Sequence, residues 1–331
     1  MAASLVVRAS ALALCAGVGT SLAAQEQSWD MPNTFGRNSS DGVADVVFAE
    51  RLQETAGGRI EIVHHFDGSL GYRGADLLEA VGDGAVPIAR HAMVYYGGFD
   101  PMFLLAALPF LVLSVDELEV LHEVAGPYFE ESFARYNQVV ISYGLFPPSG
   151  VWSREPLESL ADLQGLRLRA FDLNSLETFS GAGAGAVNMN WGDVIPAVST
   201  GAIDAVVTSA DLGVTSSLFE YLPAFLEINW AVPLSAVTVN RDVWDGLPED
   251  LQQALRDAGE QTRIRTFERL RTQVDENYED MRARGVTVIE DAPEDLLEAL
   301  YTAAEPVIQR WRDSAGDRAV VLDEYLAAVG R

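Results

Sequence analysis

Short apolar runs alternate with segments whose apolar positions recur at helical spacing along most of this chain. Residues 43–56 show helical spacing and end at a glycine pair, and residues 59–66, RIEIVHHF, follow as an expected strand. Residues 77–89, LLEAVGDGAVPIA, are expected to form a helix, a turn and a strand, and residues 139–145, VVISYGL, another strand. Strands that alternate with helices in this way predict an α/β architecture.

The longest segment with helical spacing is residues 249–283, which turn signals bound on both sides. At about 1.5 Å per residue it would extend roughly 50 Å as one helix, longer than a small domain is wide. Between Ala258 and Ile264 the apolar face rotates by about 120°, which predicts one helix that leaves one domain and packs on another. The alternative is two helices broken near Gly259. Two apolar stripes flank this change: Leu251, Leu255 and Ala258 before it, and Ile264, Phe267, Leu270, Val274, Tyr278 and Met281 after it.

Arg169 lies at the end of a short apolar run between glycine turns. A guanidinium at the end of a buried strand is unfavourable unless a carboxylate or another acceptor pairs with it. Its planar fork suits two-point contact with a carboxylate. Arg169 is therefore the best candidate for binding a ligand. The alternative is a solvated arginine on a strand edge.

The first 24 residues have the composition of a cleavable secretory signal. They contain no acidic residue, a single Arg8, an apolar run and a small-residue end, SLAA. We expect cleavage near residue 23 or 24 and export to the periplasm. A lipoprotein signal around Cys15 is disfavoured because Leu14 is bulky. Cleavage removes the only cysteine, and no other run reaches the roughly 18 apolar residues that cross a bilayer, so the exported chain is not expected to span a membrane.

The charge of the chain excludes whole classes of partner and chemistry. The formal net charge is −27, which argues against nucleic acid as a partner. All 22 basic residues are arginine, so Schiff-base lysines and phosphate-binding lysines are absent from the sequence. A GC-rich genome and a saline habitat would both favour this composition.

The sequence predicts no catalytic residues, metal site or cofactor. It contains no GxSxG, no HExxH and no cysteine pair. The four histidines, His64, His65, His91 and His122, lack the spacing of a local metal site. The run at residues 181–186, GAGAGA, matches a dinucleotide fingerprint. However, it follows a helix-like segment and precedes a strand-like one, the reverse of what the fingerprint requires.

A series of segments covers nearly all of the chain beyond the signal. In order they are FAERLQETAGGRIEI, GSLG, LLEAVGDGAVPIA, ALPFL, WSREPLESLADLQGLRLRA, GAGAVNMNWGDVIPAVSTGAIDA and VNRDVWDGLPEDLQQAL. In this order they resemble the solute-binding subunit of tripartite ATP-independent periplasmic (TRAP) transporters. The signal sequence, the missing catalytic set and the long helix agree with this resemblance.

The resemblance implies a periplasmic-binding-protein-like fold, in which two α/β domains close around a ligand cleft and a long helix spans both. It also implies capture of a small organic acid and delivery to a membrane permease driven by an ion gradient. We expect the first domain to comprise residues 25–147 and 235–272. The second is then expected to comprise residues 148–234 and 273–331.

Residue by residue, the resemblance places the carboxylate-binding arginine at Arg169 and a cleft aromatic at Trp191. For Trp191, a place in the core of the second domain stays open as the alternative. Asp172 falls where relatives often have an amide, and an acid there could bind a hydroxyl or amine. The other implied contacts are Thr208 or Ser209 in the second domain, and the strand end His91-Ala92, nearby Tyr95 and, as a looser match, Asn33 in the first.

One departure from the family pattern bears on the ligand. Some members carry a second arginine just before WSREP, where this chain has residues 146–149, FPPS. A second ligand carboxylate would lack that partner. With Trp191, Tyr95 and Trp230 as aromatic candidates, the sequence favours a monocarboxylate with an apolar or aromatic body. Two other classes stay open: a binding protein for another importer or a sensor, and an exported enzyme.

Overall fold

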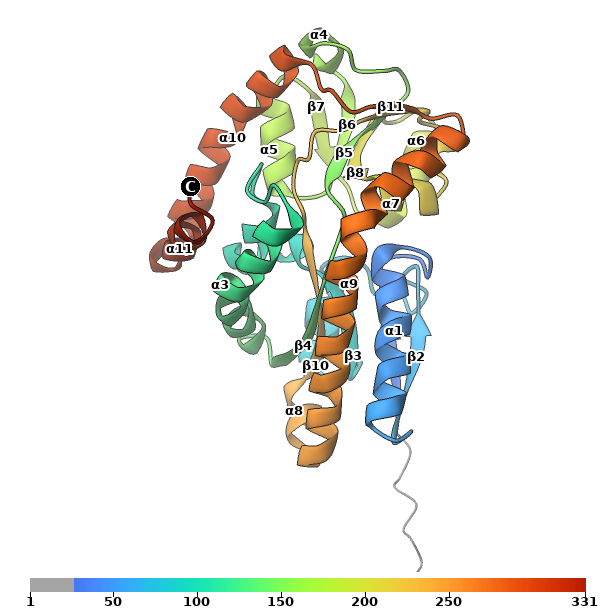
Figure 1. The fold of residues 1–331 in the computed structure, drawn as a ribbon, viewed down its shortest axis with the longest axis vertical. Helices are drawn as coiled ribbons and strands as arrows, with labels where there is room; N and C mark the ends of the chain where they lie inside the picture. Colours follow the sequence, from blue (N-terminus) through green and yellow to red (C-terminus); the bar gives the residue numbers. More distant parts are fainter. Residues whose placement is uncertain (1–26) are drawn as a thin grey trace, which may run out of the picture.

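The computed structural model describes residues 27–331, so the predicted signal peptide and Cys15 lie outside the described residues. Strands and helices alternate along the chain, which confirms the predicted α/β architecture. Figure 1 shows two layered units, one above the other, with the long helix α9 (Glu249–Ala283) running past both.

The first domain is built on a three-stranded antiparallel sheet in the order β3-β10-β4, accompanied by the parallel pair β1-β2. The elements predicted at residues 43–56, 59–66 and 139–145 are confirmed as α1, β2 and β4. The bounds are β1 Gln27–Pro32, α1 Ser40–Thr55, β2 Ile60–His65, α2 Asp76–Gly82, β3 Ile88–Ala92, η1 Met93–Tyr96, η2 Pro101–Ala107, α3 Val115–Ala134, β4 Gln138–Leu145, β10 Leu234–Asn240 and α8 Arg241–Asp245.

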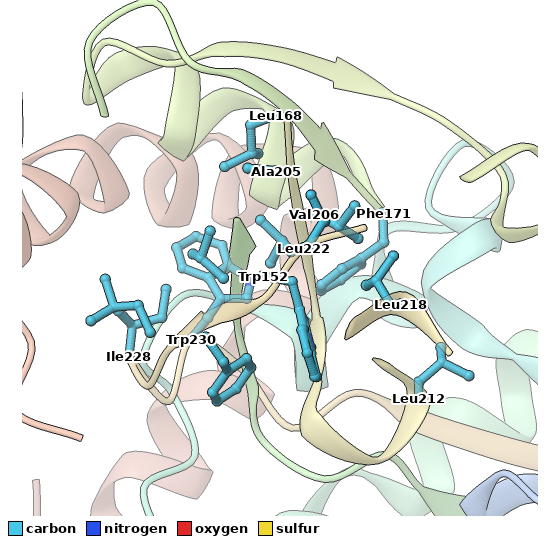
Figure 2. Packing of buried hydrophobic residues seen from close by; sticks show 14 of the residues in the cluster. Trp152, Leu168, Phe171, Ala205, Val206, Leu212, Leu218, Leu222, Ile228 and Trp230 are labelled. Carbon is cyan, nitrogen blue, oxygen red and sulfur yellow. The ribbon is translucent and has the colours of Figure 1, made fainter. Parts of the chain in front are cut away.

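The second domain is built on a six-stranded mixed sheet in the order β11-β9-β5-β8-β6-β7. Its core packs Trp152, Leu168 and Val206 under the helices (Figure 2). The bounds are β5 Ser149–Ser153, α4 Leu160–Leu163, β6 Arg167–Ala170, α5 Leu173–Gly181, β7 Gly185–Asn188, η3 Trp191–Asp193, α6 Val194–Ser199, β8 Ala205–Ser209, α7 Ala210–Thr215, η4 Leu218–Glu220, β9 Ala224–Leu226 and β11 Thr287–Ile289.

Two short segments and α9 connect the domains. Residues 146–148 join β4 to β5, and residues 227–233 join β9 to β10. The amide of Phe146 donates to the carbonyl of Pro233 at 2.9 Å, and the amide of Ser149 donates to the carbonyl of Ala231 at 3.0 Å. The two crossing segments are therefore hydrogen-bonded to each other where the chain passes between the domains.

Helix α9 has the predicted bounds and continues through Gly259, so the alternative of two helices broken there is wrong. A Cβ at Gly259 would lie 2.1 Å from the carbonyl oxygen of Ile141 in β4. The Ser142 hydroxyl donates to the Gly259 carbonyl at 2.8 Å. Glycine is required here because the helix approaches the strand closely, not because the helix ends.

The helix changes partner later than its apolar stripes predicted. Leu270 still packs in a core cluster of the first domain, Val274 contacts clusters of both domains, and Met281 packs in the second. Ile264, expected to begin the second stripe, is 43% exposed. The rotation after Ala258 instead carries α9 from one cluster of the first domain to another, so the passage between domains lies near Val274.

The C-terminal helices return toward the first domain. α10 (Glu294–Ala315) packs on α5, while α11 (Val320–Ala328) packs on α3. A short turn, η5 (Gly316–Ala319), joins them. Trp311 and Tyr325 belong to a core cluster of the first domain. The assignment of residues 273–331 to the second domain therefore stays a prediction about where that domain ends.

Candidate functional site

A cavity of about 40 Å³ lies between the two domains, against the crossing segments. One water needs about 10–15 Å³ of such space, so the cavity suits a compact molecule. Its walls come from the first domain (Phe35, Ala92, Val94, Tyr95), the crossing segments (Phe146, Pro233) and the second domain (Ser149, Arg169, Phe171, Trp191, Thr208, Ser209, Leu212).

Arg169 projects from β6 into this wall and is 2% exposed. Its Nε donates to the carbonyl of Met189 at 3.0 Å, and its Nη1 donates to the carbonyl of Val207 at 3.2 Å. It forms no ion pair with any carboxylate of residues 27–331. Burial lowers the pKa of Arg169, although the side chain stays charged at any physiological pH. Backbone carbonyls hold the fork in place without compensating its charge.

Aromatic side chains surround the guanidinium. Its carbon lies 5.5 Å from the ring centre of Trp191 and 6.0 Å from that of Phe171. Phe35 extends this wall, with ring centres 5.2 Å from Phe146 and 6.3 Å from Trp191. Burial raises the pKa of Tyr95 while the nearby Arg169 charge opposes that rise, so Tyr95 presents a neutral hydroxyl beside the cation.

Thr208 and Ser209 were predicted as alternatives, and both line the cavity from the end of β8. The Ser209 hydroxyl also caps α7, accepting from the amide of Leu212 at 3.2 Å. Ser149 of β5 lies opposite Ser209 in the sheet register. These hydroxyls supply hydrogen-bonding partners at one edge of a mainly apolar cavity.

Three of the predicted site residues do not line the cavity. Asp172 caps α5, with its Oδ1 accepting from the Ser175 amide at 2.7 Å. His91 lies on the other side of β3, hydrogen-bonded to Tyr96 at 2.6 Å and to Thr238 at 2.7 Å. Burial lowers its pKa to about 3, so it is neutral.

Asn33 is buried beside the cavity wall but does not face the cavity. Its Nδ2 donates to Asp45 Oδ2 at 2.7 Å, and its Oδ1 accepts from the amide of Phe35 at 2.8 Å. Trp230, also considered as an aromatic contact, is fully buried in the second-domain core between Phe110 and Phe179. The cavity thus gathers six predicted residues: Arg169, Trp191, Thr208, Ser209, Tyr95 and Ala92.

Most apolar residues of the cavity wall were not predicted from the sequence. Phe171, Phe35, Val94, Leu212 and Pro233 line the cavity without having been proposed. Phe146 and Ser149 also line it, and they stand in the segment where some relatives have a second arginine. A signal did exist for Phe35 and Phe171, since each lies within two residues of a predicted contact.

The comparisons with known proteins identify the family of the chain. The profile of the bacterial extracellular solute-binding protein family 7 matches residues 34–314. The chain belongs to this family. It is a TRAP-type solute-binding protein, which is a receptor rather than an enzyme, and the family is extracytoplasmic. Within residues 27–331, no helix is long and apolar enough to cross a membrane.

Three proteins similar to this family 7 chain illustrate its relatives. It is 27% identical over 262 residues to a solute-binding protein of Chromohalobacter salexigens, covering 78% of this chain and 77% of the relative. It is 26% identical to a monocarboxylate 2-oxoacid-binding periplasmic protein of Nostoc, covering 70% and 64% of the two chains. A Bordetella pertussis extracytoplasmic solute receptor that binds pyroglutamic acid is 26% identical in its crystal structure, with a TM-score of 0.86 and coverage of 90% and 99%.

Proposed function

We propose that this protein captures a compact monocarboxylate in the periplasm and delivers it to a TRAP membrane permease. The observation that carries the proposal is Arg169, a buried guanidinium that lines a small cavity and forms no ion pair with a carboxylate of residues 27–331. A ligand carboxylate would compensate that charge through two-point hydrogen bonds. Tyr95, Thr208 and Ser209 would hold the remaining polar atoms.

The rest of the cavity favours one carboxylate rather than two. Residues 146–149, where some family members have a second arginine, contain no basic residue, and Arg169 is the only basic residue among the lining residues. The lining is otherwise mainly aromatic and aliphatic, which suits a ring or short apolar body. The Bordetella and Nostoc relatives, described as binding pyroglutamic acid and 2-oxoacids, support acids of this size and charge.

Delivery involves closure of the two domains around the acid. Contacts between the domains support this: Asp211 of α7 accepts from the amide of Ser40 at the start of α1 at 3.0 Å, and Gln273 of α9 donates to Asp211 at 3.0 Å. The crossing segments and the region of α9 near Val274 are the natural pivots.

Small-angle scattering should show a smaller radius of gyration with bound acid, and an unchanged radius at saturation would contradict closure.

A thermal-shift screen tests the ligand class. L-pyroglutamate and short 2-oxo acids should stabilise the protein by about 2.7 kcal/mol at 100 times their dissociation constant. The matched control is pyroglutamide, which keeps the ring and removes the charge, and it should stabilise far less. Equal stabilisation by the amide, or stronger stabilisation by succinate than by any monocarboxylate, would refute the proposal.

Export and the transport partner are tested separately. Mass spectrometry of the exported protein should place its first residue just after position 23 or 24. Genes for two TRAP membrane subunits beside this gene would identify the permease, whereas genes for an ATP-driven importer would favour the alternative machine. Deleting the membrane-subunit genes should abolish uptake of the bound acid.

A further inference from the structure

A second, larger cleft of about 490 Å³ lies next to the ligand cavity, and Trp191 lines both. One wall comes from the first domain, from the loops before α1 and before α2. The other comes from the second domain, from the turn at Trp191 and Gly192 and from the end of α7. Trp191 separates this cleft from the cavity that Arg169 lines, so the cleft, called the entrance below, adjoins the ligand cavity at that ring.

Two arginines, Arg37 and Arg73, line this entrance and are exposed. Neither forms an ion pair in the part of the chain that the structure describes, whereas most arginines of residues 27–331 do. Arg73 reaches across the cleft, since a Cβ at Gly192 would lie 3.4 Å from its Nη1. Arg37 lies 5.9 Å from the ring centre of Phe66.

The positions of Arg37 and Arg73 matter because the whole molecule carries a large negative charge. With a net charge of −27, the protein repels a small anion at long range. The two unpaired cations beside the ligand cavity oppose that repulsion locally, and one acidic side chain, Asp67, also lines the cleft and offsets part of their charge. Charges at the rim of a binding site act mainly on the association rate and its salt dependence.

We propose that Arg37 and Arg73 form an anion-attracting entrance that speeds capture of the organic acid bound at Arg169. The inference rests on the proposed function for its ligand. It assigns to these two residues a kinetic role that the contacts inside the cavity do not supply. The entrance selects small anions over neutral analogues before the ligand reaches Arg169.

The test compares the Arg37→Gln/Arg73→Gln protein with Arg51→Gln/Arg312→Gln, which removes the same charge at ion pairs with Glu54 and Asp323. Stopped-flow tryptophan fluorescence measures association of L-pyroglutamate at low and high sodium chloride. At low salt the entrance variant should associate on the order of three- to tenfold more slowly than the wild type. Added salt should then speed its association, because the remaining field is repulsive. The control should behave like the wild type.

Equal association rates for the entrance variant and the wild type at low salt would overturn the proposal. An equal slowing in the control would also overturn it, because total charge would then explain the effect. If L-pyroglutamate fails to bind the wild type, the ligand assignment is wrong. A second measurement then tests the anion-attracting entrance without that ligand. The fluorescence of Trp191 is obtained by subtracting the signal of the matching Trp191→Phe protein. Its quenching by iodide, relative to quenching by neutral acrylamide, should be about twofold lower in the entrance variant than in the wild type. An unchanged iodide-to-acrylamide ratio would refute the entrance.

Discussion

Arg90 in the first domain and Arg169 in the second are both buried strand arginines, 1% and 2% exposed. Arg90 Nε donates to Asp45 at 2.6 Å, its Nη1 donates to Ser235 at 3.2 Å, and Asp41 lies 3.8 Å away. Arg169 donates to two backbone carbonyls at comparable distances and lies beside the neutral hydroxyl of Tyr95. The same side chain is therefore ion-paired with carboxylates at one site, whereas at the other Asp172 acts on it only at longer range and forms no ion pair.

The difference separates a structural cation from a binding cation. Gly144 leaves the space that the Arg90 side chain fills, since a Cβ at Gly144 would lie 2.4 Å from Nη1 of Arg90. Burial raises the pKa of Asp41 to about 7, and the Arg90 charge opposes that rise. Around Arg169 the space beside the guanidinium is a cavity wall instead. Burial without an ion-paired carboxylate, more than burial itself, makes Arg169 the candidate for binding a ligand.

The largest expected effect comes from breaking the compensated site. Arg90→Ala leaves Asp45 and Asp41 buried without their cation, so the free energy of unfolding should fall by about 3–5 kcal/mol. Urea denaturation of the unliganded protein measures this loss. If the alanine variant does not fold, Arg90→Lys, which keeps the charge, should fold with a smaller loss. Near-normal stability of Arg90→Ala would remove the distinction between the two arginines.

Truncating the uncompensated arginine should reverse the pattern. Arg169→Ala should weaken binding of the monocarboxylate by about 2–5 kcal/mol while leaving the stability of the unliganded protein nearly unchanged. Arg169→Lys should also bind poorly, because an ammonium cannot reproduce the fork. Calorimetric titration and denaturation measure the two quantities. Unimpaired binding by Arg169→Ala would exclude this residue from the site.

Trp191 sharpens the comparison, because an aromatic ring covers Arg169. Trp191→Ala should weaken binding by about 1–2 kcal/mol, more for bulky acids than for small ones, with little loss of unliganded stability. The matched control is Trp152→Ala in the second-domain core, where Trp152 is fully buried and about 3–5 kcal/mol of stability should be lost. A comparable stability loss for Trp191→Ala, with equal effects on small and large acids, would place its ring in the core instead.

The smallest expected effect is a pH dependence of affinity through Asp172, near Arg169. Burial raises the pKa of Asp172 to about 6, so the carboxyl is ionised at pH 8 and mostly protonated at pH 5. Its charge opposes a ligand carboxylate, which itself stays ionised above about pH 4. Affinity should therefore rise about threefold from pH 8 to pH 5. Asp172→Asn, which can still cap α5, should flatten the titration, and a persisting slope would assign it to another group.

The long helix was predictable to the residue at both ends, but its packing was not. A proline-containing turn and a following glycine mark the ends of α9 locally in the sequence. The rotation of its apolar stripe after Ala258 was equally visible, yet it reflects two clusters within the first domain. Sequence periodicity reports which side of a helix is buried but not which neighbour buries it.

The predicted site shows a similar limit at the scale of single residues. Ala92 lines the cavity while His91 points to the other side of β3, because successive strand residues face opposite ways. Phe171 lines it while Asp172 turns back to cap α5. Arg169 was identifiable because its chemistry made it unusual for a buried strand. The apolar wall carries no such chemical signature, so only the folded geometry distinguishes it from core.

The crossing segments give the cavity an unusual evolutionary constraint. Phe146, Ser149 and Pro233 are at once wall residues and members of the hydrogen-bonded connection between the domains. A substitution there that admits a new acid also changes the stiffness of the connection on which the proposed closure depends. Descendants that acquire new ligands should therefore diverge first at Leu212 and Phe35, which lie outside the connection, and the crossing segments should change late and in concert.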